Sequence, residues 1–123
     1  MKIFDANVIL RYILNDNADL ADKAAKFISE GNVLITNEVI AEVVFVLSGR
    51  IYKIERNRIK SALIAFLDEV DSQNEVIRKA LDAYGETKLD FVDCLLYAYN
   101  KLNSDEICTF DQELIKLLNE IKE

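Results

Sequence analysis

The chain has 123 residues, of which 51% are hydrophobic, so it can bury the core of one domain without disulfides or a structural metal. It contains no histidine, which excludes the usual general base of triad hydrolases and the usual ligand of catalytic zinc. Its formal net charge of -7 disfavours a polyanionic partner unless Lys and Arg gather locally. Any hydrolytic chemistry must therefore come from carboxylates.

No apolar run approaches the roughly 20 residues that a membrane span requires, and Asp5 comes too early for a secretory signal peptide. We therefore expect a cytoplasmic protein with no membrane attachment, folded as a single domain over residues 1–123. Cys94 and Cys108 lie in apolar stretches without a CxxC spacing. That setting favours buried, reduced thiols over a disulfide or a zinc site.

The hydrophobic pattern predicts strands that alternate with helices along the chain. The expected strands are residues 2–4, 33–35 and 106–110. The expected helices start after Asp5, span 18–29, run from a cap at Thr36 or Asn37 to Ser48, span 55–70 and 75–85, run from a cap at Asp90 to Leu102, and span 112–121. Strands separated by helices indicate an α/β fold with a central parallel sheet, a three-layer α/β/α sandwich.

Two aspartates stand at the ends of expected strands. Asp5 directly follows 2–4, and Asp111 directly follows 106–110. Ligand sites in open parallel sheets lie beyond the carboxyl ends of the strands, so the two carboxylates meet at one edge if these strands are neighbours. The alternative is that each aspartate only caps the helix that follows it.

Glu42 lies in a helix whose other residues from Val39 to Leu47 are all apolar, a pattern that predicts a helix buried on every side. A carboxylate buried there needs a partner, either a metal ion or a buried Arg or Lys. Asp93 raises the same question in the apolar start of the 90–102 helix. It is either a ligand or an acid favoured by the positive end of the helix dipole, while capping accounts for Asp90.

Asp5, Glu42, Asp93 and Asp111 are thus four carboxylates carried by apolar elements. If they converge, they repel one another unless a hard cation binds between them. A site made only of oxygen ligands suits Mg²⁺ or Mn²⁺, which can lower the pKa of an attacking water and stabilise a leaving oxygen. The pattern therefore predicts metal-assisted hydrolysis of phosphodiesters.

One stretch of this acidic chain is basic. Residues 50–60 hold five cationic side chains against the single acid Glu55: Arg50, Lys53, Arg56, Arg58 and Lys60. Such a run is either a solvated surface between helices or a surface that contacts nucleic-acid phosphates beside the active site.

The acidic residues and their neighbours resemble four motifs of the PIN domain family, in order and over the whole chain. The matching segments are Asp5 to Leu10, Val39 to Leu47 around Glu42, Phe91 to Ala98 around Asp93, and Thr109 to Asp111. The resemblance implies a ribonuclease whose four acids hold Mg²⁺ or Mn²⁺ and cut RNA. It also implies that Asn7 and Thr109 orient the acids through hydrogen bonds.

Among PIN domains the chain most resembles VapC-type toxins of type II toxin–antitoxin pairs. This resemblance implies an RNA substrate, a cognate antitoxin protein and a homodimer, with the region around residues 50–60 contributing to such contacts. The chain offers Glu113 where many members carry a further acid. The final strand of the family is missing, because 114–121 has a helical pattern.

Two other interpretations remain open. A haloacid-dehalogenase-like phosphatase also has an Asp at the end of its first strand, but Asn7 stands where that family has its second acid, and the chain is too short for the later lysine motif. The other is a PIN-like module that binds RNA or protein without cutting. All four acids are present, which argues against a degenerate site.

Overall fold

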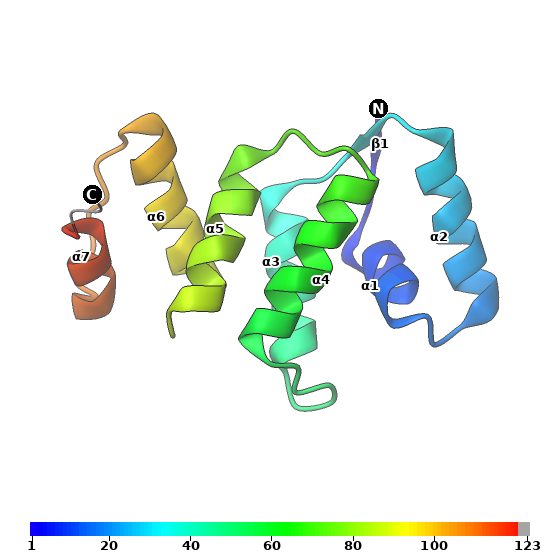
Figure 1. The fold of residues 1–123 in the computed structure, drawn as a ribbon, viewed down its shortest axis with the longest axis horizontal. Coiled ribbons are helices and arrows are strands. Elements are labelled where there is room, and N and C mark those ends of the chain that lie inside the picture. Colours follow the sequence, from blue (N-terminus) through cyan, green and yellow to red (C-terminus); the bar gives the residue numbers. More distant parts are fainter. Residues whose placement is uncertain (121–123) are drawn as a thin grey trace.

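The computed structural model describes residues 1–120, and these residues are mainly helical (Figure 1). The elements in chain order are β1 (Lys2–Ile3), α1 (Ala6–Leu14), α2 (Ala18–Glu30), β2 (Val33–Leu34), α3 (Asn37–Ser48), α4 (Arg56–Glu69), α5 (Glu75–Glu86), α6 (Phe91–Asn103) and α7 (Gln112–Leu118). None of the helices in this part of the chain is both long and apolar enough to span a bilayer.

The sheet consists of β1 and β2, which pair in parallel with Ile3 opposite Leu34. One face is covered by α2, where the ring of Phe27 lies 6.1 Å from the ring of the buried Phe4. The other face is open, since Ile3 is 64% exposed and Leu34 is 39% exposed. The three-layer sandwich is thus present only as a small parallel sheet beside helices within residues 1–120.

The expected strand 106–110 does not form. These residues form neither a helix nor a strand in the described part of the chain, and Figure 1 places them beyond α6, far from β1. The chain is held there by local contacts: the Asn100 amide donates to the carbonyl of Asp105 at 2.9 Å, and Lys101 donates to the carbonyl of Leu118 at 3.3 Å. The helix after it ends at Leu118 rather than at 121, a residue that lies outside the described range.

Helix α3 packs on one side only, which corrects the expectation of a helix buried all round. Its inner face carries Ile40, Val43, Val44 and Leu47, all buried. Glu42 is exposed, and Phe45 is 77% exposed, because the helix contacts its neighbours through that inner face and nothing in residues 1–120 covers the other. Glu42 therefore needs no buried partner in the single chain.

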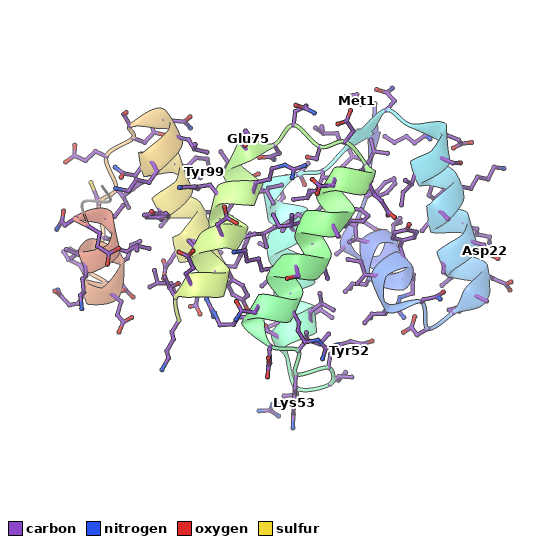
Figure 2. The ribbon with its side chains drawn as sticks, viewed as in Figure 1. Met1, Asp22, Tyr52, Lys53, Glu75 and Tyr99 are labelled. Carbon is purple, nitrogen blue, oxygen red and sulfur yellow. The ribbon has the colours of Figure 1, made fainter. Side chains whose placement is uncertain are left out.

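A polar network holds α3, α5 and α6 together. The Asn37 amide donates to the Tyr99 hydroxyl at 2.8 Å, and the Asn74 amide donates to the Asn37 side-chain oxygen at 2.8 Å and to the carbonyl of Ile35 at 3.3 Å. Tyr99 lies near the upper end of α6 in Figure 2. Directional bonds of this kind fix how α6 is oriented on the rest of the helices.

The two cysteines have different surroundings. Cys94 is buried, which confirms its expected burial, and burial raises the pKa of its thiol to about 11. Cys108 is exposed in the segment 106–110, which corrects its expected burial, because that segment is not part of a sheet. Neither cysteine forms a disulfide.

Candidate active site

Asp5 stands at the carboxyl end of β1 and caps helix α1. Its Oδ1 atom accepts a hydrogen bond from the backbone N–H of Val8 at 3.0 Å. This confirms the capping interpretation, and Asp5 is otherwise exposed to solvent. Asn7, the expected supporting residue, is exposed two positions later in the same helix.

A second group of acids lies where α6 and α7 begin. Asp90, Asp93, Asp111 and Glu113 line a hollow of about 240 Å³ together with Lys88 and Leu89. We call this the acidic hollow. It combines residues that are 23 positions apart in sequence, from Asp90 to Glu113, so the fold and not the local chain brings them together.

Asp93 is the least solvated carboxyl of the hollow. It is half-buried in the first turn of α6. Burial is the main cause that raises its pKa, and the negative charges of Asp111 and Asp90 raise it further. A carboxylate in this position is destabilised by its surroundings, and a bound cation would reverse that effect.

Asp111 caps helix α7 as Asp5 caps α1. Its Oδ1 accepts from the backbone N–H of Leu114 at 2.9 Å. The Thr109 hydroxyl accepts from the backbone N–H of Asp111 at 3.1 Å, so Thr109 positions the backbone of Asp111. Asp90 occupies the cap position of α6, but its side chain makes no capping hydrogen bond, which corrects the view that capping accounts for it.

Arg56 supports the chain that leads into the acidic hollow. Its Nε donates to the carbonyl of Tyr84 at 2.8 Å, and a terminal nitrogen donates to the carbonyl of Leu89. Its guanidinium carbon lies 3.6 Å from the centre of the Tyr84 ring. Arg56 is thus held in place by contacts within the chain. This role could not be predicted from the sequence, in which Arg56 is only one of five cations in a basic segment.

The rest of the basic segment is partly free. Lys60 forms an ion pair with Asp82 at 3.5 Å, whereas Arg50, Lys53 and Arg58 are exposed. Figure 2 shows Lys53 on the loop between α3 and α4, pointing away from the helices. Three of the five cations are therefore accessible to a large ligand.

The four candidate acids do not meet in one chain. Asp93 and Asp111 share the acidic hollow, but Asp5 lies at β1, on the other side of α3 and α5 in Figure 1. Glu42 lies on the exposed side of α3. Residues 1–120 contain no group of three or more Asp, Glu, His or Cys side chains arranged to hold a metal ion. The oxygen donors suit Mg²⁺ or Mn²⁺, but a single chain does not gather them.

The profile of the PIN domain matches residues 2–118. No curated protein and no solved structure matches the chain. The profile covers nearly the whole sequence, so the chain belongs to the PIN domain family. Members of this family are generally nucleases that bind nucleic acid and typically use Mg²⁺ or Mn²⁺. The resemblance drawn from the motifs is confirmed at the level of the family.

Proposed function

We propose that this chain is a metal-dependent endoribonuclease in which Asp5, Glu42, Asp93 and Asp111 bind Mg²⁺ or Mn²⁺. The observation that carries the proposal is the surroundings of Asp93, a half-buried carboxyl beside Asp111 and Asp90 in a hollow lined with oxygen donors. Family membership supports the same chemistry. Glu113 lies in the same hollow and supplies a further oxygen near Asp111.

The cation, when bound, supplies a more acidic water and a positive charge close to the scissile phosphate. The chain's own side chains have separate tasks. The capping hydrogen bonds hold one oxygen of Asp5 and one of Asp111, so the other oxygen of each is proposed to bind the cation. Thr109 holds the backbone of Asp111, and Asn7 is proposed to orient Asp5.

RNA is proposed to contact the exposed cations Arg50, Lys53 and Arg58. Arg56 and Lys60 were candidates from the sequence, but both have partners within the chain. These three accessible side chains would bind RNA phosphates, which the acidic remainder of the molecule repels. They lie on the loop after α3 and on the first turn of α4.

The deciding experiment is a cleavage assay on single-stranded RNA with Mn²⁺, with Mg²⁺ and with EDTA. We expect cleavage with either metal and none with EDTA. Millimolar Mn²⁺ should also raise the unfolding temperature, because the cation binds only the assembled acids of the native state. Asp22→Asn is the matched control, since Asp22 is an exposed acid on the outer side of α2 (Figure 2).

If the protein shows no cleavage and no Mn²⁺-dependent shift of the unfolding temperature, the nuclease proposal is contradicted. It would favour a scaffold that binds RNA or protein without cutting. That alternative has one observation in its favour, the absence of a three-acid group within residues 1–120. RNA binding without cleavage in the same samples would identify it directly.

The biological role that we propose is that of the toxin of a toxin–antitoxin pair, acting in the cytoplasm. This role rests on the resemblance of the motifs to VapC-type toxins. Expression of the wild-type chain should stop cell growth, while expression of Asp93→Asn should not. A small reading frame beside the gene, whose product restores growth on co-expression, would identify the antitoxin. Unimpaired growth despite active enzyme would contradict the toxin role.

A further inference from the structure

Within residues 1–120, one face and one edge of the small sheet have no partner. In parallel sheets both faces are normally covered, yet Ile3 and Leu34 lie open. β2 is the only strand beside β1 within residues 1–120, so the other edge of β1 has backbone groups available for pairing. A two-stranded sheet with an open apolar face is marginally stable by itself.

The segment 105–110 also lacks a pairing partner within residues 1–120. Its sequence has the pattern of a strand, but the segment pairs with no strand. Phe110, the residue just before Asp111, is 99% exposed. An aromatic side chain left wholly in water at the end of an unpaired strand-like segment is the kind of surface that another chain covers.

The surface area of the chain agrees with a missing partner. The solvent-accessible surface is 7783 Å² for a mass of 14.1 kDa. A compact monomer of this mass exposes about 6,700 Å², so the excess is about 1,000 Å². A stable interface of ordinary size buries about 800 Å² from each partner. The excess exposed surface is therefore enough for one such interface.

The four proposed metal-binding acids lie in two separate places in one chain. Asp5 follows β1, and Glu42 lies on the exposed side of α3, which also carries Phe45. Asp93 and Asp111 lie in the acidic hollow, and Asp111 directly follows the unpaired segment. If that segment lay beside β1 in parallel, Asp111 would come next to Asp5, because each directly follows its strand.

We propose that the active site is completed between two copies of this chain. The segment 105–110 of one copy adds to the free edge of β1 in the other, and its Asp93 and Asp111 meet Asp5 and Glu42 of the second copy. A two-fold axis makes the exchange mutual, so a dimer contains two composite sites. This inference rests on the proposed metal-dependent nuclease and adds that neither copy is active by itself.

Mixing two inactive variants tests the proposal. We expect Asp5→Asn and Asp93→Asn each to be inactive when purified alone. In a mixed dimer one site lacks both acids and the other is intact. Random exchange makes about half of all dimers mixed, so about a quarter of the wild-type activity should return after co-refolding. A site built within one chain gives no recovery.

The matched control mixes Asp93→Asn with Asp111→Asn. Both acids come from the same copy in the proposed dimer, so every composite site lacks one of them and no activity should return. Equal recovery in both mixtures would overturn the proposal, as would no recovery in the first. If the wild-type enzyme itself cuts no RNA, the nuclease proposal fails, and the contact between copies is then decided by cross-linking.

Cross-linking uses the exposed thiol of Cys108. A chain with Ile3→Cys and Cys108→Ser is mixed with a larger, tagged copy of the wild-type chain and treated with a short bismaleimide. The buried Cys94 stays unreactive. We expect a product with the summed mass of the two chains, and none when the wild-type copy carries Cys108→Ser. Absence of the summed product, or a link formed within one chain when both thiols are on it, would overturn the proposal.

Discussion

Asp5 and Asp111 have the same local structure in different surroundings. Each caps a helix, and the capping hydrogen bonds measure 3.0 Å and 2.9 Å. The segment before Asp5 is a paired strand, and Asp5 is an exposed residue outside the acidic hollow. The segment before Asp111 is unpaired, and the acid shares the acidic hollow with Asp93.

The comparison separates what a cap explains from what it does not. Capping accounts for the backbone and for one oxygen of each aspartate, and it would do so in a protein without any activity. It does not account for the acidic surroundings of Asp111 or for the raised pKa of Asp93. The functional argument therefore rests on the acidic hollow, and Asp5 joins it only through the proposed dimer.

The largest expected effect is on cleavage. Asp93→Asn and Asp5→Asn should each lower the single-turnover rate in Mn²⁺ by about 100-fold or more, because changes even to residues that only support metal ligands cost 10–100-fold. Both proteins should stay folded, since Asn can replace Asp5 as the cap of α1, and Asp93, in the first turn of α6, caps no helix. Asp22→Asn should cut normally. Near-wild-type cleavage by Asp5→Asn alone would confine the site to the acidic hollow.

The next largest expected effect is on stability. Arg56 binds the carbonyls of Tyr84 and Leu89, in the part of the chain that leads into the acidic hollow. Arg56→Ala removes two hydrogen bonds from a charged donor and the contact with the Tyr84 ring, so urea unfolding should report a loss of about 3 kcal/mol. Arg58→Ala, in an exposed neighbour, should change stability by less than about 0.5 kcal/mol. Equal losses of unfolding free energy in the two variants would mean that the contacts of Arg56 do not stabilise the fold.

The same pair of variants separates folding from RNA binding. Arg58→Ala should weaken RNA binding and reduce the salt dependence of the binding constant by about 0.7 for one lost contact with a single strand. The Mn²⁺-dependent rise in unfolding temperature should persist, because Arg58 lies outside the acidic hollow. An unchanged salt dependence would leave residues 50–60 as a solvated surface.

Removing the caps compares the two aspartates directly. Asp5→Ala and Asp111→Ala should each cost about 1 kcal/mol. Helix α1 contributes Ile9 and Leu10 to the core, so the first change should lower the global free energy of unfolding. Helix α7 is short and buries only Leu114, so the second should mainly speed hydrogen exchange within α7. A global loss from Asp111→Ala would show that α7 unfolds together with the core.

The smallest effect is a pH dependence in metal-free protein. The pKa of Asp93 is higher in the folded state than in the unfolded state, where it takes its ordinary value. The folded state therefore binds more protons between the two values, and stability should fall as pH rises through that window. Asp93→Asn should flatten the profile there. A steeper profile in the variant would mean that the neighbours of Asp93 stabilise its charged form.

Elements that depend on nearby residues were predictable from the sequence. The helix that starts at Asn37 ends at Ser48 as expected, with Gly49 as its C-cap, and strands form within 2–4 and 33–35. The prediction of a strand at 106–110 was wrong. A strand forms only where another strand offers an edge to pair with, and the residues of the segment do not show where that edge lies.

The site was predictable only in part, for a similar reason. The sequence identified Asp93 and Asp111, which the fold brings together, but it assumed that Asp5 and Glu42 would join them in one chain. The burial of Glu42 was inferred from apolar neighbours, which describe a surface that requires covering and do not say what covers it. Arg56 was missed because a charge in a run gives no sign of the backbone carbonyls that it binds.

The hydrogen bond between Tyr99 and Asn37 restrains the orientation of α6, the helix that carries Asp93. Tyr99 is six residues beyond Asp93 in the same helix, a distance of about 9 Å along the axis. If Tyr99→Phe let α6 tilt by about 10°, Tyr99 and Asp93 would shift by about 1.6 Å relative to each other, whereas metal–ligand distances tolerate about 0.2 Å. The Tyr99 hydroxyl, although remote from the carboxylates, thus helps to position Asp93. Its loss should reduce metal affinity more than it reduces stability.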